Sequence, residues 1–127
     1  MKRDNDLIKH MLLTAEESDG RVTFTESSVP DRFPEDYAFD VLRYHFTLLE
    51  DRGLIKGSAT NTSLTILHLT WEGHDFLDDA RNDTLWNAAK RNAGKLSFTA
   101  FREVVKELAK TAAGLALQAS LQQNGLG

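Results

Sequence analysis

Residues 35–55 constrain the fold of this chain more than any other stretch. Their apolar side chains recur at steps of three and four, which is the period of a helix that buries one wide face. Gly53 predicts the end of this helix, because glycine readily adopts the left-handed conformation that closes helices. Leu54 and Ile55 then begin a strand. The buried face is expected to consist of Phe39, Leu42, Phe46 and Leu49, backed by Ala38, Val41 and Leu48.

The residues before this helix predict a shorter helix followed by a strand. Asp4 or Asp6 is suited to cap a first helix. Its buried side chains are expected to be Leu7, Ile8, Met11, Leu12 and Ala15. Residues 21–26 alternate between apolar and polar, with Val22 and Phe24 on one side, as in a half-buried strand. Pro30 and Pro34 leave room in residues 27–34 for no more than a turn or one helical turn.

After the central helix, residues 54–56 and 64–69 predict a β-hairpin around the polar loop 57–63. We expect Leu67 and Leu69 to face the core, and the two-residue period then turns Leu64, Ile66 and His68 to the other face. Thr70 is suited to cap the next helix, which extends to about residue 92 with a possible second cap at residues 82–83. The inward side chains of this helix are expected to be Phe76, Leu77, Ala80, Thr84 and Ala88.

The last helix, capped by Ser97 and extending to about residue 118, has the sharpest apolar periodicity of the chain. Its apolar residues form a seam with alternating steps of three and four, which is a pattern that needs a partner helix. Two partners are open: the chain's own helix over residues 71–92, or the same helix of a second copy. We expect self-association, with a dimer favoured. The seam consists of Phe98, Phe101, Val105, Leu108, Ala112, Leu115 and Ala119.

Two segments resemble winged helix-turn-helix proteins. Residues 45–55 are similar to the recognition helix and first wing strand, and residues 69–77, with Thr70, Gly73 and Leu77, are similar to the exit from the wing. In these proteins the recognition helix lies in a DNA major groove. The resemblance implies an α+β, winged helix-turn-helix-like fold with a two- or three-stranded antiparallel sheet and additional C-terminal helices. Residues 27–34 depart from the pattern, because a second full helix should precede the recognition helix.

Four motifs together resemble an uncharacterised family of small bacterial and prophage proteins of winged-helix type, over residues 1–92. This resemblance implies a phage or mobile-element context and supplies no activity. We expect a winged-helix domain at residues 1–92, a C-terminal amphipathic helix at 93–121 and a flexible tail at 122–127. The motifs are Met1-Lys2-Arg3-Asp4 with Asp6-Leu7-Ile8, Tyr44-His45 with Leu48-Leu49 and Gly53-Leu54-Ile55, Leu69-Thr70-Trp71-Glu72-Gly73-His74 with Phe76-Leu77, and Arg81-Asn82-Asp83-Thr84 with Trp86.

The leading functional hypothesis is a DNA-binding transcriptional regulator. The candidate contacts to double-stranded DNA are Tyr37, Arg43, Tyr44 and Thr47 in the groove and Lys56 with Asn61 at the wing. Charge opposes this hypothesis, because the chain has 15 Lys and Arg against 19 Asp and Glu, a net charge of −4. Asp36 and Asp40 share the outer face of the helix, and Arg43 pairing with one of them is the alternative. The second hypothesis is a winged-helix protein-interaction or assembly module.

No arrangement of residues in the sequence supports the hypothesis that the protein is an enzyme. The four histidines, His10, His45, His68 and His74, match no metal-binding spacing, and we expect His45 to be a partly buried packing residue. The chain has no cysteine and no stretch of membrane-spanning length. We therefore expect a cytoplasmic protein that is no enzyme and has no cofactor, metal or membrane partner.

Overall fold

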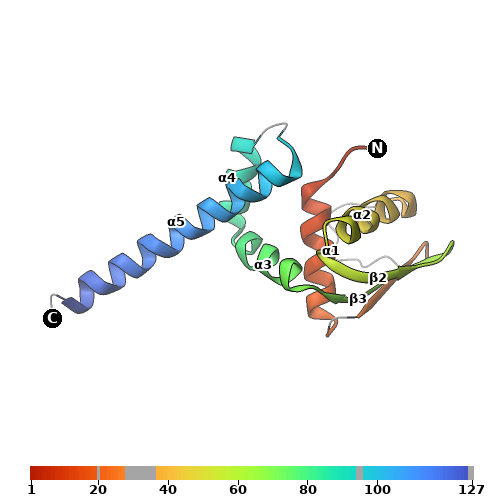
Figure 1. Cartoon of the computed structure of the whole chain (residues 1–127), viewed down its shortest axis with the longest axis horizontal. Helices are drawn as coiled ribbons and strands as arrows, with labels where there is room; N and C mark the ends of the chain where they lie inside the picture. The colour runs from red at the N-terminus through yellow and green to blue at the C-terminus, as the bar shows by residue number, and fades with distance from the viewer. Residues whose placement is uncertain (20, 28–36, 94–95, 126–127) are drawn as a thin grey trace. The chain divides into compact units, whose positions relative to one another are not determined.

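The computed structural model describes residues 1–19, 21–27, 37–93 and 96–125, and their side chains except at 92–93 and 113–125. This part of the chain contains five helices and a three-stranded antiparallel sheet, so the predicted α+β class is confirmed (Figure 1). The chain forms two compact units, Met1–Leu77 and Asp78–Gly127. The expected domains at residues 1–92, 93–121 and 122–127 stay a prediction.

The first helix, α1 (Asn5–Glu17), begins where the sequence indicates. The Asp4 carboxylate accepts the backbone N–H of Leu7 at 3.1 Å, which satisfies one of the amides left open at a helix start. All the side chains expected inside are buried: Leu7, Ile8, Met11, Leu12 and Ala15. The strand β1 (Val22–Thr25) follows, and its Phe24 is fully buried.

The central helix is α2 (Phe39–Asp51). Its predicted face is confirmed, because Phe39, Leu42, Phe46 and Leu49 are all buried. Gly53 has a φ of +68°, so the predicted glycine stop is confirmed as well. The helix begins later than residue 35, since Ala38 is still extended. Residues 35–36 and most of the predicted turn at 27–34 lie outside the described residues.

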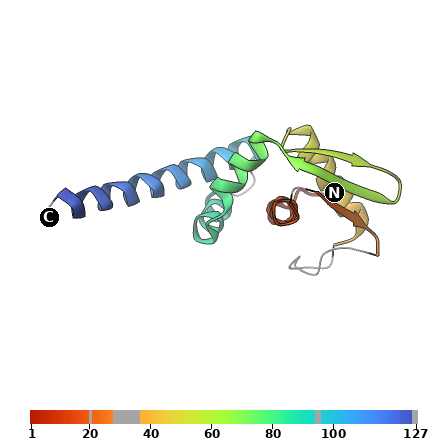
Figure 2. The ribbon, with the colours of Figure 1, turned by 90° about the horizontal axis from the view of Figure 1, so that it is seen from below.

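The strands β2 (Ile55–Ala59) and β3 (Ser63–Leu69) form the predicted hairpin, and β1 pairs with β3 to give the order β1-β3-β2 (Figure 2). The predicted facing of β3 is wrong: Leu64 and Ile66 are buried, whereas Leu67 is 37% exposed. The cause is a β-bulge, since Lys56 pairs with His68 and Gly57 with Ile66, which leaves Leu67 as an extra residue. Leu69 beyond the bulge is buried, as expected.

The core of the first unit lies between the sheet and the two helices before the hairpin. Helix α1 contacts β3, α2 contacts β2, and the two helices contact each other. Gly57 permits the contact of α2 with β2, because a Cβ at this position would lie 2.5 Å from Phe46 Cζ. Any larger residue would separate the helix from the strand.

The chain continues through α3 (Trp71–Ala80) into the second unit, which contains α4 (Asp83–Ala93) and α5 (Phe98–Gly125). The second cap considered at residues 82–83 is present, because the Asn82 side chain accepts the N–H of Leu85 at 3.1 Å. Because α4 starts as a separate helix at Asp83, the residues that point inward differ from those of one continuous helix. Trp86 and Ala89 are buried, whereas Thr84 is exposed and Ala88 half-buried, so the expected inward positions after residue 80 are wrong.

Helix α5 packs against α4. Ser97 Oγ accepts the N–H of Ala100 at 3.2 Å, which confirms the predicted cap. Phe98, Phe101 and Val105 are buried, and the Phe101 ring meets Trp86 edge-on with ring centres 5.2 Å apart. The first part of the seam is therefore covered within the chain.

Among the described residues, no helix is both long enough and apolar enough to span a membrane.

Candidate functional site

Arg43 connects α2 to the hairpin. Its Nη2 donates to the Thr60 carbonyl at 2.6 Å, and its guanidinium carbon lies 5.2 Å from the centre of the Phe39 ring one turn earlier. The alternative expected from sequence, an ion pair with Asp40, is absent from the described part of the structure, and Asp36 lies outside it. The guanidinium is thus held between the helix and the hairpin loop.

The other candidate DNA contacts on this segment also bond within the chain. Thr47 is exposed, and its hydroxyl donates to the Arg43 carbonyl at 3.0 Å. Tyr44 is half-buried with its ring edge-on to His45 at 5.3 Å. The Tyr37 hydroxyl donates to the Asp4 carboxylate at 3.0 Å. Tyr37 therefore bonds to the start of α1.

His45 is fully buried, whereas partial burial was expected. Its Nε2 accepts the backbone N–H of Asp4 at 2.7 Å, and its Nδ1 lies 2.8 Å from the Val41 carbonyl. A carbonyl only accepts and an amide only donates, so these partners require the tautomer with hydrogen on Nδ1. Together with the bond from Tyr37, this contact joins the N-terminal segment to α2. The arrangement gives His45 a structural role.

The two candidate residues of the hairpin lie at opposite ends of β2. Asn61 is exposed in the loop next to Thr60, and therefore close to Arg43. Lys56 is exposed near the start of the strand. Thr60 follows Lys56 by four positions of extended chain, a distance of roughly 13 Å. The structure thus places Arg43 against Thr60, the residue before Asn61, and leaves Lys56 at the base of the hairpin.

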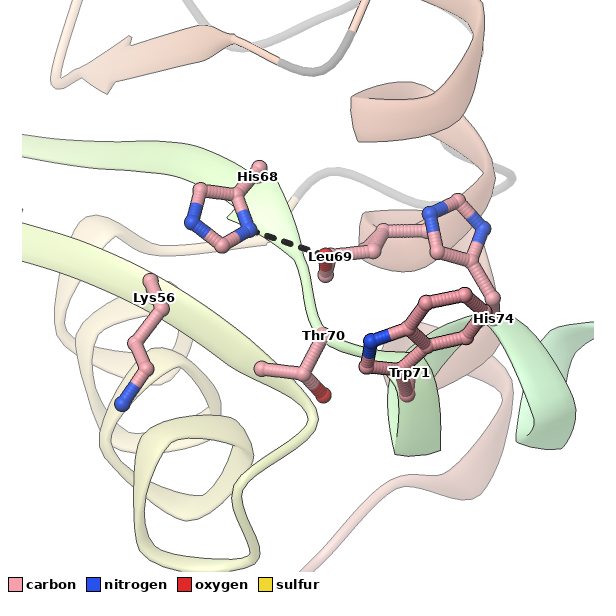
Figure 3. A pocket seen from close by; sticks show the side chains of 6 residues that line it. All are labelled: Lys56, His68, Leu69, Thr70, Trp71 and His74. Atoms are coloured by element: carbon pink, nitrogen blue, oxygen red, sulfur yellow. Dashed lines mark hydrogen bonds between the residues drawn. The ribbon is translucent and has the colours of Figure 1, made fainter.

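A pocket of about 540 Å³ lies at this base, within the first unit (Figure 3). Lys56 and His68 extend from the paired strands on one side of Thr70, and Trp71 and His74 extend from the start of α3 on the other. Trp71 is 87% exposed. Several of these residues are notable singly in the sequence, whereas the pocket that they form is not predicted from it. Its lining residues are Lys56, His68, Leu69, Thr70, Trp71 and His74.

Thr70 anchors the first turn of α3 beside the strands. Its backbone N–H donates to the Leu54 carbonyl at 3.0 Å and its hydroxyl donates to the Gly53 carbonyl. The same hydroxyl accepts the N–H of Gly73 at 3.1 Å, which confirms Thr70 as the helix cap. Gly73 is required for this approach, because a Cβ there would overlap the Leu54 carbonyl oxygen and lie 3.0 Å from its carbon. These contacts place Trp71 and His74 at the pocket.

A smaller pocket of about 350 Å³ lies at the other end of the hairpin and is lined by polar residues: Thr25, Glu26, Ser27, Asn61, Thr62 and Ser63. Across the described residues, no group of three or more His, Asp or Glu side chains is placed to hold a metal ion.

For the predicted self-association seam, Leu108 and Ala112 are half-buried, and the side chain of Leu115 is outside the described part.

Comparisons with known proteins place the chain among uncharacterised relatives. A protein of Haemophilus influenzae described as an uncharacterized protein is 38% identical over 116 residues, which cover 87% of this chain and 94% of that relative. No solved structure matches the chain. The family model described as hypothetical protein (DUF2513) matches residues 2–99. The chain therefore belongs to the DUF2513 family.

Proposed function

We propose that the first unit is a winged-helix module and that the protein works by binding protein, with a second copy of itself as the first partner. The order of elements supports the winged-helix assignment: a helix and a strand precede the central helix, and a hairpin follows it. The pairing of β1 with β3 places the first strand beside the returning strand of this hairpin. In this assignment α2 is the recognition-type helix and the β2–β3 hairpin is the wing.

The charge of the first unit favours protein over duplex DNA. Residues 1–77 contain eight Lys and Arg against fourteen Asp and Glu, a formal charge of −6. Helix α2 contains one arginine and no lysine, and Arg43 already bonds to Thr60. The exposed acidic residues of α2 are Asp40, Glu50 and Asp51. These carboxylates would repel a phosphate backbone along the helix. The acidic surface of α2 is therefore the main support for a protein partner.

The second unit supplies the surface for a second copy. Helix α5 has 28 residues and α4 has 11, so their lengths are about 42 Å and 17 Å at 1.5 Å per residue. Helix α4 is therefore too short to cover the whole seam. Leu108 and Ala112, which follow the buried Val105 on this seam, are only half-buried. Pairing of two α5 helices would bury the rest of the seam.

Sedimentation velocity tests this assembly. The parent chain is expected to sediment as a dimer at micromolar concentration, and Leu108→Asp is expected to sediment as a monomer, because a carboxylate is costly in an apolar seam. Lys106→Gln changes the net charge by the same amount at an exposed position of the same helix and is the control. A monomeric parent, or an unchanged mass for Leu108→Asp, would show that α5 packs within one chain.

DNA binding is the second candidate function, favoured by the proximity of Arg43 to the loop that holds Asn61. Fluorescence anisotropy with a mixed-sequence duplex at about 50 and 200 mM salt tests it, because neutralised phosphates make affinity fall steeply with salt. Arg43→Gln should then weaken binding more than Arg21→Gln, which removes an exposed charge in another part of the unit. Absence of binding at the lower salt concentration would dismiss this candidate. A cytoplasmic location and a phage context stay predictions.

A further inference from the structure

We propose that the pocket at the base of the hairpin binds a small aromatic anion, with the ring on Trp71 and the acidic group at Lys56. The pocket is distinct from α2 and from the α5 seam, so the proposal is independent of whether the partner is protein or DNA. Its volume of about 540 Å³ is within the range of small-molecule sites, roughly 300–1,000 Å³.

Trp71 provides the surface for the ring. It is 87% exposed, whereas the other tryptophan, Trp86, is 3% exposed. Within the described part of the chain, the Trp71 ring makes no ring contact and its indole N–H has no hydrogen-bond partner. An indole favours offset or edge-on contact with another aromatic ring. Leu67, the extra residue of the β3 bulge, is 37% exposed and lies next to the lining residue His68 in the chain.

Lys56 provides the positive charge. Its ammonium has no ion-pair or hydrogen-bond partner among the described residues. It pairs across the strands with His68, whose Nδ1 donates to the Leu69 carbonyl at 2.9 Å and whose ring is thereby oriented. His74 adds a second imidazole. None of the described residues that line the pocket is Asp or Glu, so this lining favours an anion although the unit has a formal charge of −6.

The backbone holds this site in place before any ligand binds. The bulge at Leu67 puts Lys56 and His68 opposite each other at the pocket, and bulges often re-aim side chains beside functional sites. The bonds of Thr70 and the close approach of Gly73 to Leu54 fix the backbone of the first turn of α3, on which Trp71 lies. Because this backbone is already in place, only side chains lose conformational freedom on binding, which favours affinity for a small ligand.

The test uses the full chain and 1-naphthoate as the probe. In Trp86→Phe, Trp71 is the remaining tryptophan, and saturable quenching of its fluorescence is expected on titration. By isothermal titration calorimetry on the otherwise unaltered chain, Lys56→Gln should weaken binding about fivefold or more, because it removes the charge pairing with the carboxylate. Trp71→Ala should weaken it about tenfold or more, because it removes the stacking surface.

The controls separate ring from charge. Lys2→Gln removes an exposed lysine outside the pocket and should leave the affinity unchanged. Neutral 1-naphthalenemethanol and ring-free acetate should each bind more weakly than 1-naphthoate. Lys56 and Trp71 are exposed, so thermal unfolding of these variants should match that of the parent. Absence of saturable binding, equal binding of the neutral analogue, or an unchanged affinity of Lys56→Gln would overturn the proposal.

Discussion

Gly73→Ala tests whether the backbone contact between α3 and the start of β2 is as close as the structure indicates. In an ordinary helix this change stabilises a protein by about 1 kcal/mol, because alanine is the better helix former. Here the new Cβ would overlap the Leu54 carbonyl oxygen, and a backbone atom is not free to rotate away. The first turn of α3 must therefore move away from the strand. A stabilised Gly73→Ala variant would therefore indicate an ordinary helix position, and a destabilised one would indicate the close backbone contact.

The expected cost follows from the bonds that this movement disturbs. Thr70 donates to the Leu54 and Gly53 carbonyls and accepts from Gly73. Each such bond contributes about 1 kcal/mol net, so loss of two costs about 2 kcal/mol. Strain from an inserted methyl group adds about 1–3 kcal/mol. After subtraction of the helix-propensity gain, we expect Gly73→Ala to lower the free energy of unfolding by about 2–4 kcal/mol.

Urea unfolding measures this free energy, and hydrogen exchange of the Thr70 amide reports on the site itself. Faster exchange at Thr70 is expected in Gly73→Ala, because its bond to Leu54 is weakened. Gly53→Ala is the matched control: Gly53 has a φ of +68° and a Cβ added there would meet nothing within 4 Å, so its cost is only the left-handed backbone, about 1–2 kcal/mol. A Gly73→Ala variant as stable as the parent, or more stable, would refute the close approach.

Three other substitutions are expected to destabilise the protein, with urea unfolding as the measurement. His45→Ala should cost about 3 kcal/mol, because it leaves a cavity and deprives the Asp4 N–H of its acceptor. His74 is exposed, so His74→Ala is the control and should cost almost nothing. Equal effects of the two substitutions would contradict the burial of His45. Tyr37→Phe should cost about 1 kcal/mol through loss of the bond to Asp4, and no cost would argue against that bond. Thr70→Val should cost about 1–2 kcal/mol as a lost cap, and an unchanged free energy of unfolding would contradict the role of Thr70 as the cap.

Elements whose signals are local in the chain were predicted well. The buried face of α2 and its glycine stop follow from helical period and backbone preference alone. The caps of α1 and α5 were named correctly because a side chain that bonds the amide three residues later needs no tertiary partner. The period of α4 was predicted wrongly, because a break at Asn82 changes the phase of everything after it.

The pocket could not be predicted, because each of its parts depends on residues distant in the sequence. The two-residue period of a strand holds only without a bulge, and nothing in residues 63–69 alone marks Leu67 as the extra residue. For Arg43 the sequence left two alternatives, a contact to DNA or an ion pair with a nearby carboxylate, and in the structure the side chain bonds the Thr60 carbonyl instead of Asp40. An arginine side chain is long and bonds whichever acceptor the fold brings within reach.

The sequence by itself determined the α+β composition, the central helix with its glycine stop, the caps and the acidic balance, since these depend on residues within a few positions of one another. Tertiary structure alone decided which way β3 faces, that His45 bonds Asp4, that Arg43 bonds the hairpin loop, and that Lys56, His68 and Trp71 line one pocket. The physical reason is that these contacts join residues distant in the sequence. The pairing of β2 with β3 forms the bulge, and α3 approaches Leu54 at Gly73, and no local preference specifies either contact.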